Sequence, residues 1–141
     1  MTAVIEITQD FTACYALRHR VFVQEQGVPE SEELDAHDAS ATHLLAWQNH
    51  APIGTARIVF DGNLAKIGRV CVLPDLRGTG LGADLIRAAL AIASDTPGIA
   101  TVKLGAQIQA LGFYEKLGFS ATGPVYDDAG IDHRDMVMEL A

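Results

Sequence analysis

The sequence predicts a single-domain α/β protein built on a mixed, mostly antiparallel twisted sheet that is flanked by helices. Strand-like runs separated by turn residues fill the first half of the chain. A glycine-rich turn at 78–82 then leads into an amphipathic helix. The apolar run Thr101–Ala106 that follows has the composition of a buried parallel strand. We expect residues 1–141 to form one domain, because this length suits a single core and no repeat divides it.

The first half of the chain is expected to hold a strand, a helical segment and an antiparallel meander of three strands. Val4–Ile7 has the apolar pattern of a strand, and Asp10 or Thr12 can cap a helix over Ala13–Val23. The acidic stretch 30–41 predicts a loop or a short helix. Three strands follow, the first two joined by a turn signal: His43–Gln48, Ile53–Asp61 and Ala65–Leu73.

The second half predicts a right-handed βαβ crossover followed by a terminal hairpin. The crossover helix has one apolar face, formed by Leu81, Leu85, Ala89 and Ile92. The later elements are the strand Thr101–Ala106, a short helix Gln109–Leu117 closed by Gly118, a strand beginning at Val125 and Tyr126, and a last strand Met136–Leu140.

Composition excludes several classes of protein. The net charge of −8 argues against nucleic acid as a partner, because nucleic acid requires a basic surface. We see no apolar run long enough for a membrane helix and no signal peptide, so we expect no membrane partner and a cytoplasmic location. Cys14 and Cys71 are far apart in sequence and are expected to be packed thiols, and the histidine spacing predicts no metal site.

The glycine-rich turn Arg77-Gly78-Thr79-Gly80-Leu81-Gly82 has the features of an anion site. The first N–H groups of a helix lack intrahelical partners and carry the positive end of the helix dipole. Glycines let the chain turn sharply and let an anion approach the backbone closely, and Arg77 adds a guanidinium for phosphate oxygens. A pyrophosphate is the ligand that fits this pattern, although a plain glycine-rich turn remains an alternative at this point.

The turn does not match the two best-known phosphate loops. A dinucleotide-binding loop reads GxGxxG near the chain start, whereas this one reads GxGxG in mid-chain. A Walker loop requires GK[ST], which is absent.

Further motifs resemble the GNAT superfamily of acyl-CoA N-acyltransferases over nearly the whole chain. The turn Arg77-x-x-Gly80-x-Gly82 after an apolar strand is similar to the acyl-CoA signature of that family. Leu104-Gly105-Ala106-Gln107 and Phe113-Tyr114-Glu115-Lys116-Leu117-Gly118-Phe119 are similar to its later block. Three segments resemble the small ElaA-like bacterial branch: 17–26, Glu33-x-Asp35-x-x-Asp38, and Gly130-Ile131-x-His133-x-x-Met136.

The resemblance implies a cofactor site with acetyl-CoA as co-substrate. The pyrophosphate would lie on the backbone N–H groups of Gly78, Thr79, Gly80, Leu81 and Gly82. The pantetheine arm would pair with the preceding strand around Val70 and Val72, in a gap where that strand and the next splay apart. The thioester would then lie near Tyr114, with Phe113 beside the cofactor and Gln107 orienting cofactor or substrate. Phe113 and Phe119 are also expected to be core aromatics.

Aminolysis of a thioester requires a free amine, a donor for the oxyanion and a proton for the leaving thiolate. Tyr114 is the candidate acid for the thiolate, and the Val72 backbone N–H is the candidate oxyanion donor. The candidates for the base are Glu33, Asp35, Asp38, His37 and His133, with Glu33 and His133 leading. A carboxylate acting through water also remains open.

The leading function is therefore N-acylation of a primary amine by acyl-CoA. A non-catalytic acyl-CoA sensor is the alternative, and an acyl-homoserine-lactone-type synthase or a dinucleotide enzyme fits less well. Residues 21–56 carry −6 of the net charge and no Lys or Arg, which predicts a cationic small-molecule acceptor. Exposed strand edges near the C-terminus allow a homodimer.

Overall fold

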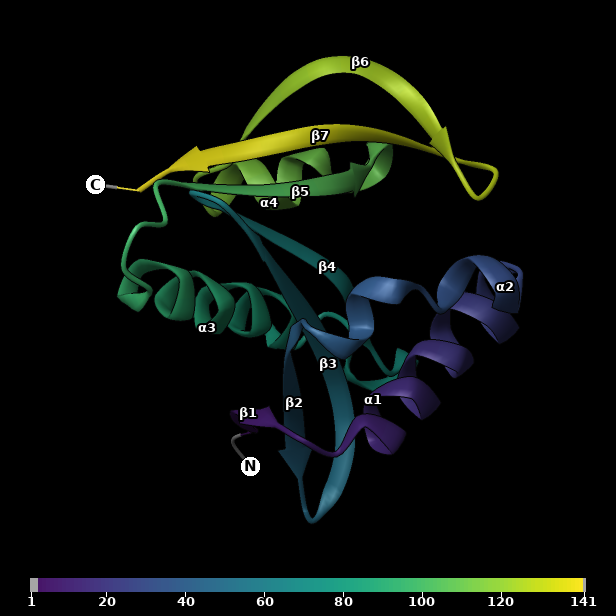
Figure 1. The fold of residues 1–141 in the computed structure, drawn as a ribbon. Helices are drawn as coiled ribbons and strands as arrows, with labels where there is room; N and C mark the ends of the chain where they lie inside the picture. The colour runs from purple at the N-terminus through teal and green to yellow at the C-terminus, as the bar shows by residue number, and fades with distance from the viewer. Residues whose placement is uncertain (1–2, 141) are drawn as a thin grey trace.

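The computed structural model describes residues 3–140 as one seven-stranded sheet with helices on both faces (Figure 1). The strands are β1 Val4–Thr8, β2 Thr42–Gln48, β3 Ala51–Asp61, β4 Leu64–Val72, β5 Thr101–Gln107, β6 Ser120–Asp128 and β7 Ile131–Glu139. The α-helices are α1 Phe11–Arg18, α2 Glu30–Glu33, α3 Leu81–Asp95 and α4 Leu111–Lys116. The other helical segments are the π-helical η1 His19–Glu25 and the 3₁₀ turns η2 Ala36–Ala39, η3 Pro74–Leu76 and η4 Ile108–Ala110.

The strand order is β1-β2-β3-β4-β5-β7-β6, and among residues 3–140 only the β4–β5 pair is parallel. This confirms the mixed, mostly antiparallel sheet. Helix α3 makes the crossover between the two parallel strands, as the sequence predicts. The second half of the sheet ends in the β6–β7 hairpin, with β7 inserted between β5 and β6.

Strands β4 and β5 pair over only three residues each. Leu64–Lys66 lies against Thr101–Lys103, and beyond these residues the two strands diverge (Figure 1). The expected splay is therefore confirmed. Where the divergence begins, a bulge interrupts the β3–β4 ladder, and Arg69 within it has a φ of 49°.

The two faces of the sheet are covered by different helices. Alternating residues of β2 point to opposite sides, so Leu44 joins the core beneath α3, whereas Leu45 packs with Cys14 and Leu17 of α1. Helix α4 contacts β5 and β6 and contributes Tyr114 to the same core as α3. Cys14 and Cys71 are both buried free thiols, as expected, and burial raises the pKa of Cys71 to about 12.

The N-terminal helix differs from the expected Ala13–Val23. The Asp10 carboxylate accepts the Ala13 N–H at 3.1 Å, so α1 begins at Phe11. From His19 the helix continues in the wider π form to Glu25. Helical spacing in the sequence does not distinguish these two windings over so short a segment.

Several boundaries in the hairpins also differ from the prediction. The β2–β3 turn is only Asn49 and His50, both with positive φ, which matches a tight two-residue hairpin. Strand β7 begins at Ile131 rather than Met136, and β6 begins at Ser120 rather than Val125. The early part of β6 holds Gly123 and Pro124, residues that usually interrupt strands.

Strand β6 arches away from β7 between two points of pairing (Figure 1). Thr122 lies opposite Asp135, and the next pair is Tyr126 with His133. Residues 123–125 of β6 therefore lie opposite a single residue of β7, Arg134. The arch explains how the glycine and proline are accommodated within the strand.

Among residues 3–140 no helix has the length and apolar character required to span a membrane.

Candidate active site

The glycine-rich turn forms the N-terminus of α3. Gly78 and Gly80 have φ values of 79° and 91°, so both occupy the left-handed region that disfavours larger residues. A Cβ atom at either position would meet no atom within 4 Å, so the space beside this backbone is open. An open helix N-terminus with orphan N–H groups fits an anionic pyrophosphate.

Arg77 lies at this turn, but its guanidinium contacts protein groups. Its Nη1 and Nη2 donate to the two carboxylate oxygens of Glu25 in η1, the latter at 2.8 Å, and its Nε donates to the Val72 carbonyl at 3.2 Å. The hydrogen bond from Arg77 lowers the pKa of the Glu25 carboxyl. Arg77 thus joins the turn to η1 and to the end of β4 in this structure.

The end of β4 presents backbone groups toward the gap between β4 and β5. The Leu73 N–H donates to the Ile53 carbonyl of β3 at 3.0 Å, and Val72 lies opposite Gly54. Because ladder bonds alternate, the Val72 N–H and carbonyl point away from β3 and into the gap. This orientation suits a cofactor arm that pairs with the strand as an additional strand.

A cleft of about 430 Å³ opens where β4 and β5 diverge. Its walls come from η1, α2, β4, β5, α4 and the β6–β7 hairpin. Of the predicted site residues, five line this cleft: Glu33, Val70, Gln107, Tyr114 and His133. The others, Val72, Arg77, Gly78, Thr79, Gly80, Leu81, Gly82 and Phe113, are not among its lining residues and belong to the β4 end, the turn and α4.

Tyr114 lies where these two groups of residues meet. It lines the cleft, and burial raises the pKa of its phenol above the ordinary value. Its neighbour Phe113 is 42% exposed, so the expectation that Phe113 is a core aromatic is wrong. The Phe113 ring instead lies 3.8 Å from where a Cβ on Gly82 would stand, which puts it beside the turn. Phe119 is buried as expected and packs edge-on against Tyr114.

His133 of β7 is half-buried in the opposite wall. Its Nδ1 lies 2.8 Å from the Ile131 carbonyl oxygen, which can only accept, so Nδ1 carries the proton. In the neutral imidazole, Nε2 is then the nitrogen that can accept a proton. The ring stacks on Tyr126 with 6.0 Å between centroids and 23° between planes.

Sequence reasoning missed Tyr126 as a site residue. Its hydroxyl donates to Asp135 Oδ1 at 2.8 Å, and it lines the cleft. Burial, together with the acceptor Asp135, raises the pKa of Tyr126 to about 12. A lone Tyr two residues after Pro124 carried no recognisable signal, because its role depends on the arch in β6.

Glu33 lines the cleft, but its carboxylate is held by two arginines. It is 4% exposed and accepts from Arg18 Nη2 at 2.6 Å and from Arg69 Nε at 3.2 Å. Asp38 accepts from Arg18 and Arg57, and Asp35 from Arg57 and Arg69. Three carboxylates and three arginines therefore form one ion-pair network, which we call the arginine network.

The arginine network changes how the acidic window should be interpreted. The window 21–56 has no cation of its own, but Arg18, Arg57 and Arg69 enter from α1, β3 and β4. Burial opposes ionisation of Asp38, yet hydrogen bonds from Arg18 and Arg57 outweigh it and lower the pKa well below its usual range. Within the cleft, the acidic residues outside this network are Glu32 and Asp128.

Gln107 contributes to a contact across the mouth of the cleft. Its Nε2 donates to Gln26 Oε1 at 3.3 Å, and its own Oε1 accepts from Gln109 at 2.6 Å. The amide therefore joins the end of β5 to the segment after η1. This position agrees with a role in orienting a bound molecule, which stays a prediction.

Comparison with known proteins agrees with this architecture. The model of the acetyltransferase (GNAT) domain matches residues 7–140. ElaA of Escherichia coli (strain K12) is 35% identical over 133 residues, covering 91% of this chain and 86% of its own. YjcF of Bacillus subtilis (strain 168), named an uncharacterized N-acetyltransferase, is 33% identical over 141 residues, covering 99% of this chain and 100% of its own.

A solved structure of an acyl-CoA N-acyltransferase from Pseudomonas aeruginosa superposes with a TM-score of 0.85 at 30% identity, covering 98% of this chain and 99% of that one. The splayed strands, the glycine turn and these matches together define an acyl-CoA-dependent transferase fold. The chain belongs to the GNAT acetyltransferase family, with ElaA among its relatives, as the motifs predicted.

Proposed function

We propose that this protein transfers the acetyl group of acetyl-CoA to a primary amine by direct aminolysis of the thioester. The observation that carries the proposal is the order of three features along β4 and beyond its end. Val70 lines the cleft that contains Tyr114, the backbone of Val72 faces the gap, and the open glycine turn follows. These three features would accommodate a pyrophosphate, an extended arm and a reacting group in succession. Membership of the GNAT family supports the same assignment.

The described residues fit the cofactor. The N–H groups from Gly78 to Gly82 would hold the pyrophosphate at the start of α3, where packing leaves the backbone accessible. The outward-facing backbone of Val72, and Val70 beside the cleft, would pair with the pantetheine arm. Phe113 would border the cofactor beside Gly82. When bound, acetyl-CoA supplies the activated acyl group.

Tyr114 would donate a proton to the leaving thiolate. A partly buried phenol with a raised pKa remains protonated across the physiological range, as this role demands. The Val72 N–H points into the gap and is the proposed donor to the developing oxyanion. Both roles place the reacting carbonyl between β4 and α4.

His133 is better arranged than Glu33 to accept a proton from the amine. The Nδ1–H of His133 is engaged with Ile131, which leaves Nε2 as the basic nitrogen at the cleft. Glu33, by contrast, accepts hydrogen bonds from Arg18 and Arg69 and would have to leave them to act. Asp35 and Asp38 are similarly paired with arginines.

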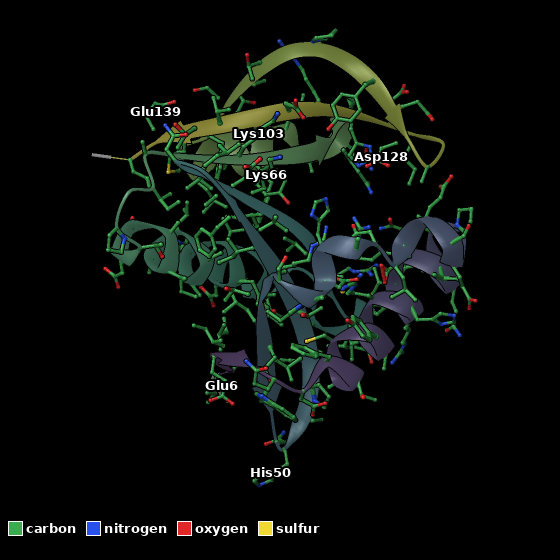
Figure 2. The ribbon with its side chains drawn as sticks, viewed as in Figure 1. Glu6, His50, Lys66, Lys103, Asp128 and Glu139 are labelled. Atoms are coloured by element: carbon green, nitrogen blue, oxygen red, sulfur yellow. The ribbon has the colours of Figure 1, made fainter. Side chains whose placement is uncertain are left out.

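We still propose a cationic acceptor, but because of two carboxylates in the cleft rather than because of the whole acidic window. The arginine network compensates Glu33, Asp35 and Asp38, so their field is largely cancelled. Glu32 and Asp128 line the cleft from α2 and β6 and would attract a second positive group of the acceptor. Figure 2 places Asp128 at the end of the β6–β7 layer that faces α2.

The alternative function is a sensor that binds acyl-CoA without turnover. A screen that follows free thiol release from acetyl-CoA over polyamines, amino acids, amino sugars and peptides separates the two. Turnover with an amine supports the enzyme. Calorimetric binding of acetyl-CoA with no thiol release from any acceptor would support the sensor.

A further inference from the structure

We infer that Tyr126 and Asp135 are positioning residues that hold the His133 imidazole in the tautomer and orientation of a general base. The inference rests on the proposed function, in which His133 accepts the amine proton. It arises from a set of contacts that join β5, β6 and β7 beside the cleft. The motifs of the sequence name Gly105, Ile131 and His133 among these residues, but neither Tyr126 nor Asp135.

The first contact fixes Tyr126 where β6 returns to the ladder after its arch. Residues 123–125 leave the pairing, and Tyr126 restores it directly opposite His133. The Tyr126 hydroxyl donates to Asp135 Oδ1 at 2.8 Å, and Lys103 Nζ lies 3.4 Å from Asp135 Oδ2. The phenol is therefore tied through Asp135 to both β7 and β5, on the face where Figure 2 shows Lys103.

Gly105 makes room for this arrangement. A Cβ atom at position 105 would lie 2.4 Å from the Tyr126 hydroxyl oxygen, closer than any real contact allows. Gly105 has no positive φ, so its backbone does not itself require glycine. The requirement comes from the phenol, which passes over β5 at this point.

The anchored ring then limits the motion of His133. The imidazole stacks on Tyr126 on one side, and its Nδ1–H donates to the Ile131 carbonyl. Rotation about the ring torsion would break both contacts. Gln107 of β5 lies opposite His133 in the strand ladder. The other charged side chains that line the same cleft are Asp128 of β6, Glu32 and Glu33 of α2, and Arg69 of β4.

Tyr126→Phe is the variant that tests the inference, because it keeps the ring and removes the anchor to Asp135. We expect kcat to fall between about tenfold and a hundredfold, as expected for a misplaced catalytic group, with KM for acetyl-CoA unchanged. Thr122→Val, on the other side of the arch, is the matched control and should retain wild-type kcat. Gly105→Ala, which displaces the phenol, should reproduce the loss.

Two further measurements isolate positioning from folding. Nitrogen-15 NMR of the neutral imidazole should show the Nδ1–H tautomer of His133 in the wild type and a mixture in Tyr126→Phe. In a His133→Ala background, Tyr126→Phe should cause no further loss of kcat, because Tyr126 acts through His133.

The contrary results separate the positioning claim from the base assignment. A wild-type Nε2–H tautomer, or an unchanged tautomer and kcat in Tyr126→Phe, overturns the inference. An equal loss of kcat in the His133→Ala background also overturns it, because Tyr126 would then act independently. Full activity of His133→Ala contradicts the base assignment within the proposed function, whereas the tautomer measurement still decides the positioning claim.

Discussion

Arg18 and Glu33 form a two-point ion pair in the interior, with Arg18 Nη2 to Glu33 Oε2 at 2.6 Å and Arg18 Nε to Glu33 Oε1 at 2.9 Å. Arg18 is 1% exposed, so this pair lies away from solvent. The pair fixes α2 against α1 on one wall of the cleft. Arg69, within the β4 bulge, donates to the Glu33 carbonyl at 2.8 Å and extends the same network to the sheet.

Arg18→Ala should destabilise the fold strongly. Removing one partner of a buried ion pair leaves an uncompensated charge, which typically costs about 3–5 kcal/mol of the free energy of unfolding. Urea unfolding monitored by circular dichroism measures this difference. Arg87→Ala, which removes an exposed guanidinium paired with Asp84, is the control and should change stability by less than about 0.5 kcal/mol. Equal effects of the two variants would contradict the structural role of the arginine network.

Stability should fall at acid pH because the network needs ionised carboxylates. The arginine partners hold the pKa of Asp38 below its ordinary value, and the pKa of Asp35 is lowered in the same way despite partial burial. A folded pKa below the unfolded one contributes stability above about pH 4, and this contribution is lost as pH falls through the folded pKa. Urea midpoints measured from pH 7 downward should show this decline.

Asp38→Asn tests the origin of that decline, since the amide does not titrate. The variant should be less stable at pH 7 and should lose less stability on acidification than the wild type does. The exposed Asp95→Asn serves as control and should follow the wild-type curve. An unchanged pH dependence in Asp38→Asn would show that other groups cause the acid sensitivity.

Gly80→Asp should weaken cofactor binding. The substitution places a negative charge at the N-terminus of α3, and each charge-assisted hydrogen bond lost costs about 1.5–3 kcal/mol. We expect the affinity for acetyl-CoA to drop at least tenfold in calorimetry. Gly62→Asp introduces the same side chain at another glycine of positive φ, in the β3–β4 turn, and controls for backbone strain. A folded Gly80→Asp protein with wild-type affinity would refute the assignment of the turn.

Tyr114→Phe should reduce kcat without weakening acetyl-CoA binding. The ring and its edge contacts with Phe113 and Phe119 remain, while the proton source for the thiolate is removed. Loss of a positioned acid costs about 10²–10⁴ in rate. Because burial raises the pKa of Tyr114, an alkaline fall in wild-type kcat due to this phenol should lie above about pH 10 and be absent in the variant.

Steady-state rates and calorimetry together decide the role of the hydroxyl. Full activity of Tyr114→Phe would mean that water protonates the thiolate. Simultaneous loss of activity and of acetyl-CoA affinity would mean that the hydroxyl holds the cofactor.

Much of the fold was predictable because local patterns and tertiary contacts agree. The glycine turn, the crossover helix and the short parallel strand each carry their own signal, and all three occur where expected. The prediction failed for the start of β6, which begins at Ser120 rather than at Val125 and contains Gly123 and Pro124. The structure accommodates both residues in an arch, and only tertiary pairing with β7 reveals it.

The chemistry of the site could be predicted only in part, because it too depends on tertiary contacts. Tyr114 belongs to a recognisable block. Tyr126 reaches the cleft only because of the arch and of a glycine twenty-one positions earlier in the chain. The acidic window suggested a negative surface because its arginine partners lie outside it. Charge patterning along a sequence does not show which cations the fold brings to a carboxylate.

Transfer of an acetyl group onto an amine nitrogen is the reaction that we propose for this chain. Mass spectrometry of acceptors incubated with the purified protein and acetyl-CoA, with free thiol measured in parallel, tests it directly. We expect at least one amine, with cationic amines favoured, to gain a single acetyl group in a one-to-one ratio with released thiol. Tyr114→Phe should form this product far more slowly. Saturable acetyl-CoA binding without an acetylated amine in any sample would contradict it.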